Sequence, residues 1–277
     1  MAFKKIYLEI SNLCNLSCAF CPGTKRTPRR MTPEDFAFLA PKLRPYTEYL
    51  YFHLMGEPLC HPQLKEFLEI AYNHNFRVII TTNGTLLSRQ QDLLLSSPAL
   101  HKINISLHAF EANDLVVPFE DYLTDCFAFG QAAKGEKLVV YRLWNQGGAD
   151  QRNEEILASL RAAFPQPWIP ERQGMRIAHR TYLEYGDKFD WPNLQAPEGS
   201  NRVFCYGLRD QLGVLCDGTV VPCCLDHEGD LALGNLFTQE LPEILSSPKA
   251  KAIYDGFSRK EATEELCRKC GYARRFL

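Results

Sequence analysis

The sequence predicts an α/β fold in which repeated strand–helix units build a parallel sheet, followed by a small cysteine-rich region. Three observations lead to this prediction. Strand-like and helix-like segments alternate over about the first 150 residues. Glycine, proline and cysteine become dense after about residue 185. The chain has 277 residues, which is enough for one large domain with a smaller one attached.

Six strands are expected in the first region, and five helices lie between or after them. The segment 31–43 opens with Thr32 as a cap and Pro33 in the first turn, which is a typical helix start. The β-branched segment 77–82 ends in Asn83 and Gly84, a turn signal. The expected strands are 4–10, 49–54, 77–82, 102–108, 137–144 and 175–183, and the helices 31–43, 64–74, 89–95, 119–134 and 153–164. Such units form an open partial barrel or a wound sheet, with the active site at the carboxyl ends of the strands.

The last quarter of the chain has a different texture. Asp217 and Gly218 lie inside the apolar segment 215–221, which predicts a tight β-hairpin. A helix is expected at 241–257, before a short cysteine-rich end. We therefore predict two domains, residues 1–190 and residues 191–277.

Composition limits the classes of function. The chain has 31 Lys and Arg against 33 Asp and Glu, a net charge of −2, which excludes a broad nucleic-acid-coating surface. No apolar run reaches signal-peptide or membrane-spanning length, so we expect a cytoplasmic protein with no membrane partner. Thiols stay reduced there, and the 11 cysteines therefore point to metal or catalytic sites rather than disulfides.

The first cysteine cluster directly follows the first strand. Cys14, Cys18 and Cys21 lie within eight residues and can face one centre. Structural zinc sites use four ligands, whereas a [4Fe–4S] cluster held by three cysteines keeps one iron free to bind another molecule. Packed core cysteines are the other interpretation, but a polar loop would not bury them.

This C-x3-C-x2-C spacing after the first strand of a β/α chain resembles the signature of the radical S-adenosylmethionine (radical SAM) enzymes. The resemblance implies a partial (β/α)6 TIM-like barrel, a SAM cofactor and a flavodoxin- or ferredoxin-type reductant. Met55-Gly56-Glu57-Pro58 matches the family's Gly-Gly-Glu-Pro element, with Met55 in the first glycine place. The SAM-binding residues implied by the resemblance are Phe20, Gly56, Glu57, Asn83, Ser106 and Arg142.

A second cluster gathers six cysteines in the last quarter. The C-x2-C pair Cys267 and Cys270 is a strong ligand signal. The layout resembles the SPASM/twitch extension of radical SAM enzymes, which implies a second [4Fe–4S] cluster in a twitch-type domain of hairpin plus helix. The implied ligands are Cys205, Cys223, Cys267 and Cys270, with Cys216 and Cys224 as the alternatives. Lone Cys60 and Cys126 are expected to be core residues.

Alternation along the strands points further side chains into the barrel. The substrate candidates from this alternation are Tyr7, Glu9, His53 and His108. A fifth, Lys188, lies 17 residues before Cys205, where the resemblance to 2-deoxy-scyllo-inosamine dehydrogenases implies a substrate-contacting basic residue. The loop 25–30 carries four positive charges beside the first cluster and is either a solvated loop or an anion site.

These features predict a radical enzyme acting on a small polar metabolite. The sharpest hypothesis, from a resemblance to queuine lyases, is cleavage of the base–ribose bond of queuosine 5′-phosphate. There, Glu9 or an Asp would pair with the substrate's amine. The alternatives are a sugar or cyclitol alcohol dehydrogenase, as in 2-deoxy-scyllo-inosamine dehydrogenases, and a peptide-modifying SPASM maturase. The maturase is disfavoured because the barrel is expected to begin at residue 4, which leaves no room for an N-terminal leader-peptide-binding domain. A zinc-ribbon interaction protein is disfavoured because it leaves Cys14–Cys21 unexplained.

Overall fold

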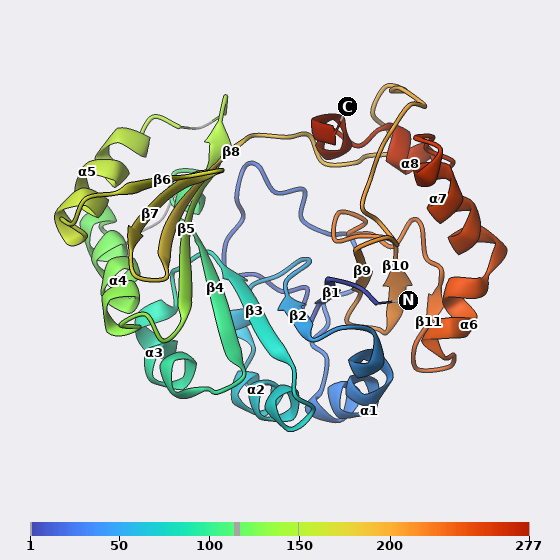
Figure 1. Ribbon diagram of the computed structural model, residues 1–277, viewed down its shortest axis with the longest axis horizontal. Coiled ribbons are helices and arrows are strands. Elements are labelled where there is room, and N and C mark those ends of the chain that lie inside the picture. Colours follow the sequence, from blue (N-terminus) through green and yellow to red (C-terminus); the bar gives the residue numbers. More distant parts are fainter. Residues whose placement is uncertain (1, 114–116, 149, 277) are drawn as a thin grey trace.

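A single curved sheet organises the computed structural model, which describes residues 2–113, 117–148 and 150–276. Its strand order is β11-β10-β9-β1-β2-β3-β4-β5-β8-β7-β6. Figure 1 shows the central strands as an arc with helices along its outer side. The strands β1 to β5 and β8 pair in parallel, namely β1 (Lys5–Leu8), β2 (Tyr49–Phe52), β3 (Arg77–Thr82), β4 (Leu100–Ser106), β5 (Leu138–Gln146) and β8 (Thr181–Asp187). The predicted α/β class with a parallel core is confirmed.

Five helices cover the outer side of this arc (Figure 1). Their apolar faces bury residues such as Phe36, Phe67 and Phe129 against the sheet, and burial of such side chains drives the packing. The helices are α1 (Pro33–Leu43), α2 (Leu64–Asn73), α3 (Leu87–Ser96), α4 (Phe119–Ala132) and α5 (Asn153–Ala163). Short 3-10 turns are η1 (Arg44–Tyr46), η2 (Pro58–Cys60), η3 (Leu107–Ala109) and η4 (Tyr272–Phe276).

The predicted start of α1 is confirmed in detail. The Thr32 hydroxyl accepts a hydrogen bond from the Asp35 backbone N–H, and the Asp35 carboxylate accepts one from the Thr32 N–H. This reciprocal capping box satisfies donors that a helix end otherwise leaves without partners.

The single strand predicted at 175–183 is wrong. The segment forms two antiparallel strands, β7 (Gly174–Ala178) and β8, and β6 (Ile169–Glu171) pairs with β7. Arg180 has φ +53°, so the chain turns back between Ala178 and Thr181. The apolar pattern continues through this turn, which is why it reads as one strand.

The C-terminal region continues the barrel's sheet. Strand β9 (Gln211–Val214) pairs in parallel with β1, and β10 (Thr219–Val221) returns antiparallel as the predicted hairpin, next to β11 (Gly234–Asn235). The helix predicted at 241–257 is two helices, α6 (Leu241–Ser246) and α7 (Pro248–Ser258). The Ser247 hydroxyl caps α7 at the Ala250 N–H, and Pro248 cannot continue α6. A short α8 (Glu265–Arg268) precedes the C-terminal turn.

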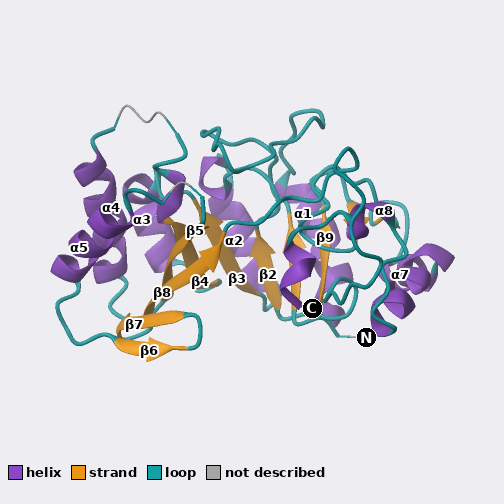
Figure 2. Ribbon diagram, turned by 90° about the horizontal axis from the view of Figure 1, so that it is seen from above, coloured by secondary structure: helices purple, strands orange, loops and turns teal. Residues whose placement is uncertain are grey.

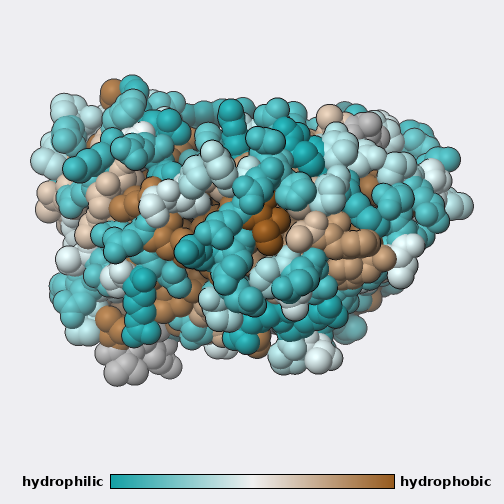
Figure 3. Space-filling model, turned by 90° about the horizontal axis from the view of Figure 1, so that it is seen from below, coloured by the Kyte–Doolittle hydropathy of each residue, from teal (hydrophilic) through white to brown (hydrophobic). Residues whose placement is uncertain are grey.

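No helix in the described part of the chain combines the length and apolar character needed to cross a membrane. Seen from above, strands β2 to β5 are in view, and loops gather around β9 and α8 (Figure 2). The opposite face is mostly hydrophilic, with apolar side chains visible in patches between the polar ones (Figure 3).

Candidate cluster sites and the cavity between them

The first cysteine loop leaves β1 and presents its thiols near the surface. Cys14 and Cys21 are exposed and Cys18 is half-buried. The Leu16 backbone N–H lies 3.4 Å from the Cys14 sulfur, and the Asn113 amide donates to the Cys18 sulfur at 3.1 Å. Desolvation by the surrounding protein raises the pKa of Cys14 to about 11. This thiol therefore keeps its proton near neutral pH until a metal replaces it.

The segment after β2 packs directly against the cysteine loop. Gly56 has φ +75°, and a Cβ there would overlap the carbonyl oxygen of Ser11. The Glu57 N–H donates to the Leu13 carbonyl oxygen at 2.9 Å. Only glycine combines this backbone conformation with so close an approach, which explains Gly56 in the Met-Gly-Glu-Pro element.

Glu57 joins the ends of β2 and β3. Its carboxylate accepts hydrogen bonds from the backbone N–H groups of Leu59 at 3.0 Å and Asn83 at 2.8 Å. Burial raises the pKa of Glu57 to about 7, against these hydrogen bonds, which lower it. The Asn83 side chain donates to Asn15 in the cysteine loop at 2.9 Å. Gly56, Glu57 and Asn83 therefore hold the loop in place.

The other three predicted SAM contacts line one cavity. Phe20 packs 5.0 Å from His108, centroid to centroid, and Ser106 ends β4 beside them. Arg142 also lines the cavity, but its Nε lies 3.2 Å from a Glu184 carboxylate oxygen. The assignment of these six residues to SAM remains a prediction.

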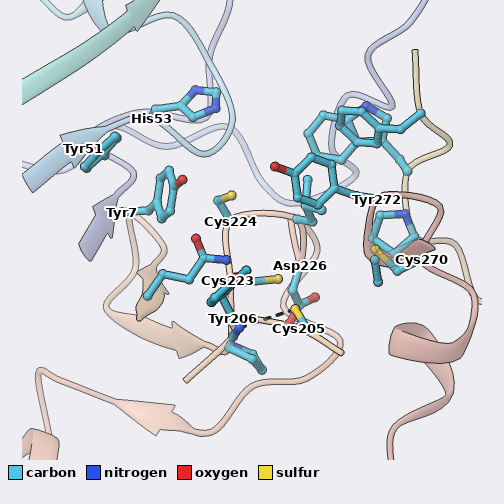
Figure 4. Close-up of a pocket in the computed structure, with 18 of the residues that line it drawn as sticks. Tyr7, Tyr51, His53, Cys205, Tyr206, Cys223, Cys224, Asp226, Cys270 and Tyr272 are labelled. Carbon is cyan, nitrogen blue, oxygen red and sulfur yellow. Dashed lines mark hydrogen bonds between the residues drawn. The ribbon is translucent and has the colours of Figure 1, made fainter. Parts of the chain in front are cut away.

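The cavity has a volume of about 650 Å³ and lies between the barrel and the C-terminal region. Figure 4 shows Tyr7, Tyr51 and His53 on the barrel side, with Cys223, Cys224 and Asp226 facing them. Volumes of this size are typical of small-molecule sites. Both cysteine regions therefore border, or lie next to, the same space.

The structure brings the four predicted auxiliary ligands together. Cys205, Cys223, Cys267 and Cys270 all line the cavity. The pKa of Cys223 lies well above its ordinary value. Burial is the largest cause, and the charges of the neighbouring cysteines add to it. The Gly207 N–H approaches the Cys205 sulfur at 3.4 Å. The donor set suits a cluster with four thiolate ligands.

The two alternative ligands lie in different places. Cys224 lines the cavity and acts electrostatically on Cys223, while Tyr7 contacts its thiol. Cys216 is buried on another side, against Glu9 and Arg26. Cys224 is thus the alternative ligand that lies near the four thiols. Cys216 contacts Glu9 and Arg26 and does not line the cavity.

The thiol groups are not arranged for one ion. Within residues 2–113, 117–148 and 150–276, no three His, Cys, Asp or Glu side chains converge as the ligands of a single metal ion would. A [4Fe–4S] cube binds each cysteine through a different iron, so its ligands stand farther apart. Both groups fit such cubes: the three thiols of the first cysteine loop, and the four thiols that line the cavity.

Two of the predicted substrate contacts lie elsewhere. The Arg26 guanidinium binds the buried Glu9 carboxylate through hydrogen bonds of 2.8 and 2.6 Å. Glu9 also accepts from the backbone of Cys216 at 3.2 Å, so it is a structural hub outside the cavity lining. Arg26 belongs to the predicted anion loop, but its guanidinium is already paired with Glu9. Lys188 is exposed and does not line the cavity either.

The remaining three substrate candidates do line the cavity. Burial lowers the pKa of His53 to about 4, and that of His108 to about 4. Both rings are therefore neutral near pH 7. Tyr7 lies 5.1 Å from Tyr51, centroid to centroid. These uncharged groups suit a polar substrate.

Sequence reasoning missed Asp226 and Lys102, which both line the cavity. Asp226 is buried, and its oxygens accept hydrogen bonds from the Asp230 and Leu231 backbone at 2.9 Å each. Burial raises its pKa to about 6. Its position three residues after Cys223 is a signal, because that distance keeps it close to a cluster ligand. Lys102 shares the inward phase of Asn104 and Ser106 on β4, which is a second signal.

Two protein-family models match the chain. Residues 8–164 match the radical SAM superfamily, and residues 205–271 match SPASM, an iron–sulfur cluster-binding domain. The chain therefore belongs to the radical SAM superfamily. These two domains imply two [4Fe–4S] clusters and SAM as the cofactors. The predicted family and cofactors are confirmed, while the ligand residues and the boundary at 190 stay predictions.

Several characterised proteins are similar in sequence. The chain is 28% identical to the S-adenosyl-L-methionine-dependent 2-deoxy-scyllo-inosamine dehydrogenase of Niallia circulans, covering 97% of this chain and 92% of that protein. It is 29% identical to a tungsten-containing aldehyde ferredoxin oxidoreductase cofactor-modifying protein of Pyrococcus furiosus, over 50% of this chain but 39% of the relative. It is 23% identical to the subtilosin biosynthesis protein AlbA of Bacillus subtilis, covering 64% of that protein.

Solved structures share the fold. BtrN, crystallised with AdoMet and 2-DOIA, superposes with a TM-score of 0.64 at 18% identity, over 98% of this chain and 93% of that one. The enzyme anSMEcpe with bound AdoMet gives 0.66 at 14% identity, over 97% and 88%. At these identities the likeness shows the fold alone.

Proposed function

We propose that this radical SAM enzyme cleaves the base–ribose bond of a phosphorylated nucleoside, with queuosine 5′-phosphate as the substrate and queuine as the released base. The observation that carries the proposal is the aromatic lining of the shared cavity. Nine aromatic side chains line it, namely Tyr7, Phe20, Tyr51, Trp144, Phe189, Trp191, Tyr206, Phe257 and Tyr272. Aromatic faces stack well on planar bases.

Asp226 supports the same proposal. A carboxylate whose oxygens are each fixed by one backbone N–H can still accept a further bond from an ammonium group. With a pKa of about 6 it is mostly ionised near neutral pH. Asp226 thus takes the role of the acid that pairs with the substrate's amine, because Glu9 is occupied by Arg26.

The chemistry comes from the cofactor and the positioning from this chain. SAM bound beside a reduced cluster supplies a 5′-deoxyadenosyl radical, which removes hydrogen from an unactivated carbon. Phe20 and His108 form an aromatic wall next to the first cysteine loop.

A second candidate is oxidation of a sugar or cyclitol alcohol. The proposed auxiliary ligands line the cavity, so a second cluster there could accept an electron from the substrate. The similarity to the 2-deoxy-scyllo-inosamine dehydrogenase over 97% of this chain supports this candidate too.

Anaerobic turnover separates the candidates. The reconstituted enzyme is incubated with SAM and a reductant, and 5′-deoxyadenosine and free queuine are followed by mass spectrometry. We expect queuosine 5′-phosphate to stimulate both products. The control is a Cys14/Cys18/Cys21→Ala variant, which should retain about half of roughly eight irons and cleave no SAM. No stimulation removes the lyase, and formation of a ketone from 2-deoxy-scyllo-inosamine instead establishes the dehydrogenase. Stimulation only by a peptide would establish a maturase.

A further inference from the structure

Four cationic side chains line the cavity, and three of them lie on strands of the barrel. The fourth, Lys4, is exposed and pairs with Asp210. Lys5 begins β1, Lys102 lies on β4 and Arg142 on β5. They are partly buried, with side-chain exposures of 23% for Lys102 and 15% for Arg142. Desolvation lowers the pKa of Lys5 and of Lys102, and the nearby Arg142 charge lowers both further. Lys5 and Lys102 therefore both lie within reach of the Arg142 charge.

One carboxylate serves two of these cations. Glu184 lies 3.2 Å from the Arg142 Nε and 3.8 Å from the Lys102 Nζ. Lys5 makes no ion pair within the described residues. Its ammonium instead lies 5.4 Å from the Tyr7 ring centre and 5.6 Å from that of Tyr51.

Other acids of the cavity are engaged elsewhere. Asp210 lines it but binds the exposed Lys4 at 2.7 Å. Asp226 accepts hydrogen bonds from the Asp230 and Leu231 backbone and lies on the same side of the cavity as Cys223 (Figure 4). Lys5, Lys102 and Arg142 carry three positive charges against the two carboxylates of Glu184 and Asp226, which leaves one positive charge in excess in the cavity. Gathering like charges in a space of low dielectric is costly unless an anion compensates them.

A buried donor without a partner lies beside this group. The Trp144 indole Nε1 has no hydrogen-bond partner in the part of the chain the structure describes. The Arg142 guanidinium sits 4.4 Å from the centre of the Trp144 rings. An indole N–H can only donate, so an acceptor is missing here, and an anionic oxygen would supply it.

We propose that Lys5, Lys102 and Arg142, with the Trp144 N–H, form an anion subsite that binds a phosphate monoester of the substrate inside the barrel. This inference rests on the proposed function only in placing the substrate in this cavity. It moves the phosphate from the loop 25–30 to the barrel interior.

The SAM carboxylate is the other source of an anionic oxygen. Lys5 is the first residue of β1, and three further residues of a strand cover about 10 Å before the chain leaves towards the cysteine loop. Five of the six predicted SAM-binding residues lie at or after the carboxyl ends of strands, and the sixth, Arg142 inside β5, is reassigned here to the phosphate. Lys5 thus belongs to the end of the barrel away from SAM, which favours the substrate's phosphate.

Calorimetry on the reconstituted holoenzyme tests the subsite without turnover. With SAM bound and no reductant, ribose 5-phosphate and ribose are titrated separately. We expect ribose 5-phosphate to bind at least tenfold more tightly than ribose. Lys5→Met and Lys102→Met should each weaken ribose 5-phosphate about tenfold and leave the affinity for SAM within twofold. Lys65→Met, which removes an exposed lysine on α2 that does not line the cavity, should change neither affinity.

Each contrary outcome is distinct. Equal binding of ribose and its phosphate, or no binding of either while SAM binds, overturns the subsite. Weakened SAM with unchanged ribose 5-phosphate assigns the anion to the SAM carboxylate and also overturns it. Melting temperatures check folding, and removing one of several like charges should not lower them. If queuosine 5′-phosphate is not cleaved but the phosphate effect persists, only the proposed reaction fails.

Discussion

The Glu9 carboxylate and the Arg26 guanidinium form two hydrogen bonds of 2.8 and 2.6 Å, with the Glu9 side chain fully buried. The same carboxylate accepts from the backbone of Met55 at 3.3 Å and of Cys216 at 3.2 Å. Arg26 also donates to the His227 carbonyl oxygen at 2.8 Å. This pair therefore ties β1, the Met-Gly-Glu-Pro element and the C-terminal hairpin together.

Loss of this pair should destabilise the protein strongly. Glu9→Gln leaves the Arg26 charge buried without its anion, and we expect the free energy of unfolding to fall by about 3 kcal/mol. The matched control is Asp210→Asn, which breaks the exposed 2.7 Å pair with Lys4 and should lower the free energy of unfolding far less, because solvent screens that pair. Urea unfolding measures both. Equal losses would show that Glu9 is not a hub.

The auxiliary ligand set can be separated by iron content. Cys223→Ala should lose about four of roughly eight irons, because Cys223 lies amid the other thiols. Cys216→Ala should keep them all, since its thiol contacts Glu9 instead. Iron and sulfide analysis after anaerobic reconstitution gives the answer. Loss of four irons in Cys216→Ala would show that Cys216 is a cluster ligand and would contradict our assignment.

Gly56→Ala should disturb the first cluster. The added Cβ meets the Ser11 carbonyl oxygen and must push the cysteine loop away. We expect the variant to lose SAM binding and at least 2 kcal/mol of stability, of which about 1–2 kcal/mol is the cost of the left-handed conformation. Gly147→Ala is the control, because Gly147 has the same φ of +75° and nothing within 4 Å of its Cβ position. Equal effects of the two substitutions on stability and SAM binding would show that the backbone conformation alone, and not the contact with Ser11, causes the loss.

Glu57 should make stability depend on pH. Its pKa is raised from 4.5 to about 7 in the folded protein, so the folded state binds this proton more tightly than the unfolded chain. The resulting stabilisation is complete below about pH 4.5 and is lost as the pH rises through about 7.

We expect the SAM-free enzyme to lose on the order of 2 kcal/mol to this group across that window. Urea unfolding at several pH values should show a flatter profile for Glu57→Gln. Glu69→Gln removes an exposed carboxylate on α2 and should retain the wild-type profile. A Glu57→Gln profile as steep as that of the wild type would contradict the assignment.

The sequence predicted the parts of the fold that local patterns determine. The segments around β3 and α1 carry strong propensities and caps, and both formed as expected. The break at Pro248 and the turn at Arg180 were missed because apolar periodicity continues across them. The same limit explains Glu9, whose partner Cys216 lies 207 residues away, a contact that no local signal reports.

The ladder between β1 and β9 pairs Lys5 with Gln211 and Leu8 with Val214. The strand that leads into the first cysteine loop and the strand that leads into the second cysteine region are thus neighbours in one sheet. This ladder fixes the starting points of the two cysteine regions relative to each other. Removal of β9 would leave β1 as a bare edge prone to aggregation.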